Sequence, residues 1–253
     1  MASAELTVNW PKRPKLRLYV ADDLAADAAV TLAGGQAHYL AHVMRARPGE
    51  AVALFNGRDG EWRAEITVVG KKQVTLGVGE RIAEQVTGPD LWLVFAPVKR
   101  ARIDFVAQKA TELGASALLP VFTDFTAVDR TNTDRLAANA REAAEQCLCL
   151  AVPEIRAPQK LAALLADWPE DRALIFCDET AEGTDPLGAL AGVAPGPAAL
   201  LIGPEGGFSD AERVAIRALP QATAISLGPR LLRADTAAVA ALTLWQAARG
   251  DWR

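Results

Sequence analysis

The second half of the chain alternates apolar runs of strand length with segments of helical spacing, and this alternation restricts the fold more than any other feature. The apolar runs cover residues 91–97, 117–122, 173–177, 198–203 and 222–228. Helical spacing marks residues 102–113, 133–150, 161–166, 210–219 and 235–248. Strands that alternate with helices in this way build a mostly parallel sheet covered on both faces. The pattern therefore predicts an α/β domain.

Local signals mark several of the expected helix ends. Ser209 and Glu212 have the spacing of a capping box before the 210–219 helix, and Pro220 follows its end. Gly114 stands after the 102–113 helix, where a left-handed residue commonly ends a helix. Thr133 is the expected N-cap of the long alanine-rich helix.

Residues 16–84 have a different pattern, in which short strands are separated by turn residues. Strands are expected at 16–20, 51–57, 61–69 and 73–78, with hairpin connections at NGRDG and GKK. One helical interruption is expected at 36–45, where Tyr39, Leu40, Val43 and Met44 have helical spacing. The composition changes at 86–89, which include Gly88 and Pro89. We therefore expect a β-rich domain at 1–86 and the α/β domain at 87–253.

The charge of the chain argues against a dedicated nucleic-acid binder, because such proteins usually carry a strong basic excess. The net charge is −4, and residues 1–85 hold 11 Lys/Arg against 10 Asp/Glu. Basic residues nevertheless cluster, and these clusters are either a local positive face or a solvated surface. They are Lys12, Arg13, Lys15 and Arg17, and then Arg45 and Arg47.

No apolar run approaches the length of about 20 residues that crosses a bilayer, and the N-terminal residues do not resemble a signal peptide. A cytoplasmic protein without membrane contact is expected. The two histidines, His38 and His42, could share one helical face as metal ligands. No third cluster of ligands accompanies them, so we expect no metal and a structural or RNA-contacting role instead.

Two apolar runs end in glycine-rich turns. LLIGPEGG at 200–207 and SLGPRLLRADTA at 226–237 each lead from a strand into a helix. Neither fits a dinucleotide or phosphate-loop pattern. Ligands of open α/β sheets bind outside the carboxyl ends of the strands, and glycine lets the backbone approach a ligand closely. The two loops are thus either the walls of one ligand pocket or tight strand-to-helix connections.

The second loop also carries charged residues with more than one interpretation. Arg230 and Arg233 could bind a phosphate or a carboxylate, or could pair with acids at the surface. Asp235 or Thr236 could cap the last helix.

The motif pair LLIGPEGGFSDAE and SLGPRLLRADTAAVAAL resembles that of the 16S ribosomal RNA (uracil-N3)-methyltransferases, the RsmE family. Further blocks extend the resemblance, in family order, from about residue 16 to the C-terminus. They are His38–Gly49, Phe55-Asn56-Gly57, Lys99–Gly114, Ala144-Glu145-Gln146 and Val152-Pro153-Glu154-Ile155.

The resemblance implies a PUA-like RNA-binding domain at 1–86 and a SPOUT methyltransferase domain at 87–253, whose parallel sheet carries a deep trefoil knot. It also implies a homodimer that takes S-adenosylmethionine as methyl donor and acts on 16S ribosomal RNA or the small ribosomal subunit during ribosome biogenesis. A knot is a rare exception to normal chain topology, so periodicity does not predict it.

The family's donor site maps onto the two loops. One wall of the donor pocket is Leu201, Gly203, Glu205, Gly206 and Gly207, and the other is Leu227, Gly228, Leu231, Leu232 and Arg233. Backbone groups would bind the adenine and leucine side chains would cover it. The expected RNA contacts are Arg17, Arg45, Arg47 and Arg102.

The chain departs from the family pattern at two places. Cys147-Leu148-Cys149-Leu150 replaces a segment that usually contains an arginine, which puts an RNA contact from this turn in doubt. Ala234-Asp235-Thr236 replaces Thr-Glu-Thr, and aspartate keeps the charge of glutamate with a shorter reach.

Methylation of uracil N3 requires loss of the N3 proton, because the neutral imide nitrogen has no free in-plane lone pair. Arg233 is the candidate for stabilising negative charge on the uracil oxygens, and Glu205 or Asp235 for accepting the proton. Two alternatives remain, namely a SPOUT enzyme with another RNA acceptor and a noncatalytic RNA-binding assembly factor.

Overall fold

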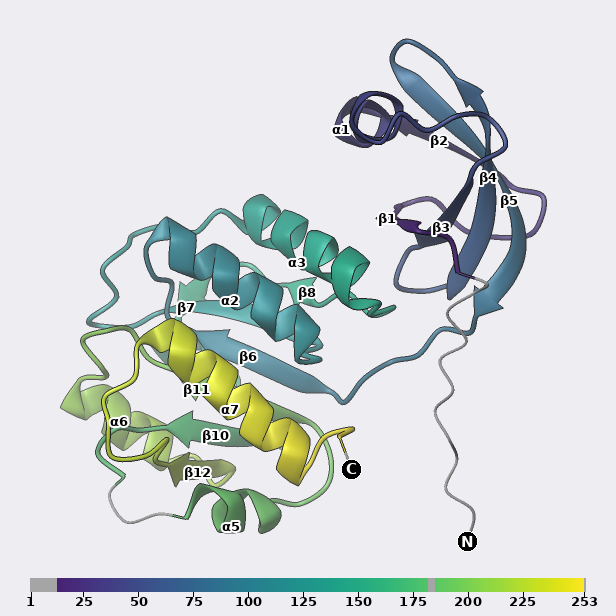
Figure 1. The fold of residues 1–253 in the computed structure, drawn as a ribbon. Helices are drawn as coiled ribbons and strands as arrows, with labels where there is room; N and C mark the ends of the chain where they lie inside the picture. Colours follow the sequence, from purple (N-terminus) through teal and green to yellow (C-terminus); the bar gives the residue numbers. More distant parts are fainter. Residues whose placement is uncertain (1–12, 182–184, 253) are drawn as a thin grey trace, which may run out of the picture. The chain divides into compact units, whose positions relative to one another are not determined.

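The computed structural model describes residues 13–181 and 185–252, without the side chains of Arg100 and Ala101. Lys12, one member of the predicted basic cluster, lies outside the described residues. The chain divides into two compact units, Met1–Val86 and Thr87–Arg253 (Figure 1). No described helix has both the length and the apolar character needed to cross a membrane.

The N-terminal unit is a five-stranded sheet of order β1-β3-β4-β5-β2. Its strands are β1 (Leu16–Tyr19), β2 (Ala29–Ala33), β3 (Ala51–Phe55), β4 (Glu61–Val69) and β5 (Gln73–Ala83). Both expected hairpins are present, because β4 pairs antiparallel with β3 and with β5. β2 was not predicted from the sequence. Burial alternates along this strand, so that only Val30 and Leu32 lie in the core.

The predicted helix at 36–45 is wrong in its winding. The chain forms one α-helical turn, α1 (Gly34–His38), and then a π-helix, η2 (Tyr39–Val43). The amide of Met44 donates to the carbonyl of Tyr39, the five-residue hydrogen bond of a π-turn, at 2.9 Å. π winding turns side chains at α-helical spacing away from a common face. Leu40 is therefore buried, whereas Tyr39, Val43 and Met44 are exposed.

The C-terminal unit contains the predicted parallel sheet, of order β12-β10-β11-β6-β7-β8. Its strands are β6 (Leu91–Phe95), β7 (Ala117–Phe122), β8 (Glu154–Ile155), β10 (Ala173–Cys177), β11 (Ala198–Ile202) and β12 (Ala222–Ile225). A short strand, β9 (Gln159–Lys160), pairs with β7. Every strand pair in this unit is parallel, which confirms the α/β assignment.

Helices cover both faces of this sheet. The helices α2 (Arg100–Glu112), α3 (Thr133–Cys147), α5 (Pro186–Ala191) and α7 (Ala234–Ala248) share one apolar core with the sheet. The helices α4 (Leu161–Ala166) and α6 (Asp210–Arg217) share the core of the opposite face. Figure 1 shows α2, α3 and α7 side by side over the sheet. Because both faces are covered, the strands are apolar on both sides.

The helix ends agree with most of the predicted signals. Ser209 and Glu212 form a complete capping box, and Gly114 has a φ of +76° after α2. The predicted N-cap of α3 is off by one residue, because the side chain of Asn132 accepts from the amide of Arg135. α3 also ends earlier than predicted, at Cys147, since Leu148 is left-handed with a φ of +62°.

Candidate active site

Three strand exits meet at one edge of the parallel sheet. β10 lies between β11 and β12, and Phe176 is level with Leu201 while Cys177 is level with Ile225. The two predicted loops therefore flank the exit of β10, where the chain continues with Asp178 and Glu179. Ligands of open α/β sheets bind at such an edge.

A cavity of about 640 Å³ lies at this edge. Every residue assigned to the donor pocket by resemblance lines it except Leu201. Its lining comprises Arg102, Cys177–Glu179, Ile202–Gly207, Ser226–Gly228 and Arg230–Ala234, together with Ala237. The two predicted loops are thus walls of one pocket rather than separate connections.

Leu201 is not among the residues that line the cavity. Its side chain is fully buried among Trp92, Phe176 and Phe208 on the sheet face covered by α4 and α6. The next residue, Ile202, faces the opposite core and lines the cavity. Leu231 lines the cavity with a side chain that is 82% exposed.

The glycines of the first loop fit close neighbours. A Cβ at Gly203 would lie 2.6 Å from Cε2 of Phe208, whose ring is buried against Phe176. Gly207 has a φ of +69°, where side chains are disfavoured. A Cβ there would lie 2.5 Å from Oε1 of Glu179. Glycine at these two positions therefore lets the loop backbone pack closely against Phe208 and Glu179.

Arg102 and Glu205 form an ion pair at the cavity, with Nη1 and Oε1 2.8 Å apart. The two residues are 103 positions apart in the chain, and the sequence placed them in different roles. Both side chains remain partly exposed, so they are accessible to a ligand.

The acidic residue of the last helix does not have the predicted structural role. α7 begins at Ala234 with Arg233 at the N-cap position, and no side chain caps it. Asp235 instead accepts a hydrogen bond from the amide of Thr236 at 2.9 Å and does not line the cavity. Among the described residues, Arg230 and Arg233 have no ion-pair partner, so the predicted pairing with surface acids is not observed.

Sequence reasoning missed an ionic cluster beside the cavity. Asp178 is buried and accepts hydrogen bonds from the backbone and hydroxyl of Thr180, from Arg217 at 2.6 Å, and from Arg213. Burial by itself raises the pKa of Asp178, but these donors outweigh it and hold the pKa below its ordinary value. Arg213 also donates to Glu179 at 2.5 Å. The only sequence signal was a pair of acids directly after an apolar run.

The thiol of Cys177 lines the cavity but is not a nucleophile. Burial raises its pKa to about 12, so the thiol stays protonated at neutral pH. Within residues 13–181 and 185–252, no group of three or more His, Cys, Asp or Glu side chains could hold a metal ion. His38 and His42 have ring centroids 4.9 Å apart.

The predicted RNA contacts fall into two groups. Arg45 and Arg47 are exposed, and Arg102 is partly exposed at the cavity. The structure corrects Arg17, whose side chain is 5% exposed, pairs with buried Glu61 at 2.5 Å and stacks on Phe55. Its burial leaves it unavailable to RNA.

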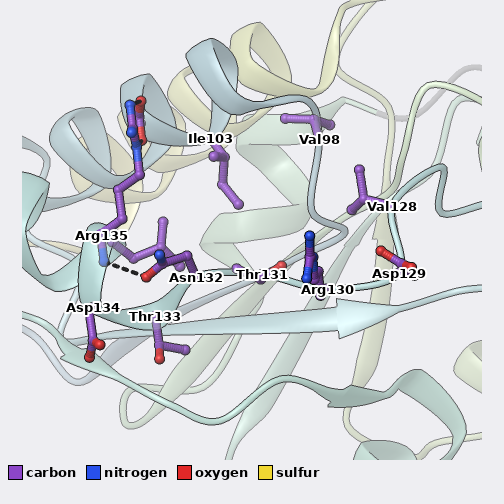
Figure 2. Close-up of a pocket in the computed structure, with 12 residues that line it drawn as sticks. Val98, Ile103, Val128, Asp129, Arg130, Thr131, Asn132, Thr133, Asp134 and Arg135 are labelled. Carbon is purple, nitrogen blue, oxygen red and sulfur yellow. Dashed lines mark hydrogen bonds and ion pairs between the residues drawn. The ribbon is translucent and has the colours of Figure 1, made fainter.

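A second cavity, of about 750 Å³, lies between α2 and the segment that leads into α3 (Figure 2). Val98, Ile103 and Val128 contribute apolar side chains, and residues 129–135 contribute polar ones. Arg135 makes two hydrogen bonds to Asp104 across this cavity, at 2.5 and 2.7 Å. No glycine is among the residues that line it, in contrast to the cavity at the strand exits.

Comparison with known proteins gives the same two regions. Residues 86–246 match the RNA methyltransferase domain family, and residues 32–79 match the RNA methyltransferase PUA domain family. Ribosomal RNA small subunit methyltransferase E of Synechocystis is 31% identical over 231 residues, which cover 89% of this chain and 75% of that protein. The Rickettsia conorii protein of the same name is 29% identical and covers 89% and 93%.

Two solved structures share both units. A methyltransferase from Legionella pneumophila, solved with bound S-adenosylmethionine, is 31% identical with a TM-score of 0.82, covering 93% of this chain and 98% of that one. The Neisseria gonorrhoeae ribosomal RNA small subunit methyltransferase E, also bound to S-adenosylmethionine, is 25% identical with a TM-score of 0.81, covering 95% and 100%. The fold predicted by resemblance is thereby confirmed, and the chain belongs to the ribosomal RNA small subunit methyltransferase E family.

Proposed function

We propose that this protein transfers a methyl group from S-adenosylmethionine to N3 of a uridine in 16S ribosomal RNA. The observation that carries the proposal is the cavity at the exits of β11, β10 and β12, with its two glycine-containing walls. Relatives that share both units carry this donor in their solved structures. Gly203, Gly206 and Gly207 line this cavity, which suits a flat adenine that is recognised through backbone groups.

Two charged side chains of the site have different expected roles in the reaction, one as the base and one as the group that stabilises negative charge. When bound, the donor supplies an electrophilic methyl group on a sulfonium. Uracil N3 must lose its proton, and Glu205 is the better placed of the two candidate bases, because it lines the cavity and Asp235 does not. Arg233 also lines the cavity, and no described acid neutralises it. Its guanidinium is the group that would stabilise negative charge on the uracil oxygens.

The ion pair between Arg102 and Glu205 suggests how RNA affects the base. In the structure, the carboxylate of Glu205 is held by its ion pair with Arg102. An RNA phosphate is a strong competitor for an arginine side chain. Binding of the phosphate to Arg102 would release Glu205 toward the substrate. Arg102 would in this way serve both RNA binding and the base.

The roles of the two units are part of the same proposal. The N-terminal unit, residues 1–86, would bind RNA through exposed Arg45 and Arg47, and residues 87–253 would carry the donor pocket and the family's knot. A homodimer would let a second chain add RNA contacts, which suits a protein with a net charge of −4. The substrate would be 16S RNA or the assembled small subunit, in the cytoplasm.

The test is methylation of undermethylated small subunits and of free 16S RNA by the purified protein, followed by mass mapping of the modified nucleosides. We expect one 3-methyluridine. A methyl group at another atom or in another RNA would support the alternative of a SPOUT enzyme with a different acceptor. Failure to bind S-adenosylmethionine in calorimetry would support a noncatalytic assembly factor.

The roles of the charged residues are tested separately from donor binding. Arg233→Ala and Glu205→Gln should lower kcat by about 10² to 10⁴, the usual range for acid–base and electrostatic groups, with donor affinity nearly unchanged. Asp235→Asn is the matched comparison, and we expect a smaller loss. Full activity in both Arg233→Ala and Glu205→Gln would refute the assignment.

A further inference from the structure

The exit of β10 gives the donor pocket a third component, between the two glycine-containing walls. Glu179 lines the cavity, and its side chain is 39% exposed. Oε1 of Glu179 accepts a hydrogen bond from Nη2 of Arg213 at 2.5 Å. A carboxylate has about four acceptor positions, so this bond leaves capacity for a ligand.

The side chain of Arg213 is itself held in place by the buried carboxylate of Asp178. It donates to Asp178, whose side chain has no exposed surface, and Arg217 donates to the other oxygen of the same carboxylate at 2.6 Å. Burial alone lowers the pKa of Arg213, but the contacts with Glu179 and Asp178 outweigh it and raise the pKa, so the guanidinium stays charged. The orientation of Glu179 is therefore fixed through Arg213 by a fully buried acid.

The first glycine loop packs directly on this ion pair. A Cβ at Gly207 would lie 2.5 Å from Oε1 of Glu179 and 3.3 Å from Nη2 of Arg213. The loop backbone, which binds the donor in the proposed function, and the carboxylate of Glu179 are thus held at a fixed separation.

We propose that Glu179 binds the ribose hydroxyls of the methyl donor, and that Arg213 and Asp178 are positioning residues for it. This inference rests on the proposed function. A vicinal diol offers two donors, which match an ionised carboxylate that only accepts. Carboxylates that follow a parallel strand bind ribose hydroxyls in the same way in dinucleotide folds. Because Arg213 already neutralises Glu179, the carboxylate serves the ligand as an acceptor rather than as a counter-charge.

The experiment compares two nucleosides that differ only in the diol. Calorimetry would measure binding of 5′-deoxy-5′-methylthioadenosine, which has adenine and ribose but no amino acid, and of its 2′,3′-dideoxy form. Wild-type protein should prefer the diol by about tenfold or more, the range for hydrogen bonds to a charged group. Glu179→Gln should lose most of this preference, while binding the dideoxy compound almost as wild type does. Glu142→Gln, on the exposed face of α3, is the matched control.

Positioning is tested by the same ratio. Arg213→Met should also reduce the preference for the diol, whereas a general loosening of the pocket would weaken both nucleosides equally and leave the ratio unchanged. An unchanged ratio in Glu179→Gln overturns the assignment of Glu179, and an unchanged ratio in Arg213→Met overturns the positioning role. Wild-type protein that does not bind S-adenosylmethionine at all would instead overturn the proposed function.

Discussion

Replacing Asp178 with alanine should destabilise the C-terminal unit by about 3 kcal/mol, the low end of the cost of removing one partner from a buried charge pair. One feature of the structure raises the expected loss of stability, and another limits it. Asp178 has no exposed side-chain surface and accepts from Thr180, Arg213 and Arg217. Arg217 is half exposed, however, and Arg213 retains Glu179, so neither guanidinium is left buried without a partner.

Amide hydrogen exchange followed by mass spectrometry is the suitable assay, because it reports on each unit separately in a chain that need not unfold in one step. Peptides from β10 and α6 should lose protection in Asp178→Ala, and peptides from β3–β5 should not. Glu154→Ala is the matched control, since its ion pair with Arg156 is exposed and should contribute less than about 1 kcal/mol. A loss below about 1 kcal/mol for Asp178→Ala would refute the reasoning that this buried acid anchors the cluster.

The same variant predicts a pH dependence whose sign follows from the lowered pKa of Asp178. A carboxyl with a lower pKa in the folded state stabilises the fold above its unfolded pKa, about 3.9 for Asp, and loses that contribution as the pH falls through the folded value. The difference between wild type and Asp178→Ala should therefore be constant from pH 7 to about pH 5 and shrink only below about pH 4. A difference that shrank near pH 6 would contradict this origin.

Gly203→Ala should lower both thermal stability and donor affinity, because the new Cβ would meet the buried ring of Phe208 at 2.6 Å; differential scanning fluorimetry and calorimetry measure the two effects, and unchanged values would contradict the packing argument. Arg17→Ala should destabilise the N-terminal unit by about 1 to 3 kcal/mol, since Glu61 is fully buried and would keep Arg13 as a partner; hydrogen exchange would show this, and weaker RNA binding without loss of protection would restore the surface role. Arg102→Ala should change stability by less than about 1 kcal/mol but slow methyl transfer; a rate equal to wild type would remove Arg102 from the site.

Those parts of the fold that depend on residues close together in the chain were predictable from the sequence. Ser209 and Glu212 act within one helical turn, and the apolar runs of β6, β10 and β11 are continuous because both faces of each strand are buried. The same continuity explains why the sequence did not show that the side chain of Leu201 faces away from the cavity. A strand that is apolar on both faces has no alternation from which the side facing the pocket can be read.

The residues that the sequence did not reveal are those whose roles depend on strand order. Glu179 and Asp178 enter the candidate site only because β10 lies between β11 and β12, and no glycine marks this exit. Arg17 becomes buried because β1 pairs in parallel with β3, which brings it to Phe55 and Glu61. In both cases the partners are more than 30 residues apart, so no local pattern records the contact.

The strand order also changes how the charge of the chain bears on RNA binding. A net charge of −4 sums charges that neutralise each other inside the fold, such as Arg17 with Glu61 and Arg213 with Asp178. These pairs neither attract nor repel a phosphate at a distance, because each is a close, largely buried dipole. What RNA meets are the side chains at the surface, among them Arg45 and Arg47, for which the described residues supply no acid partner. The acidic total is therefore compatible with an RNA substrate, because affinity depends on which charges are exposed and unpaired rather than on their sum.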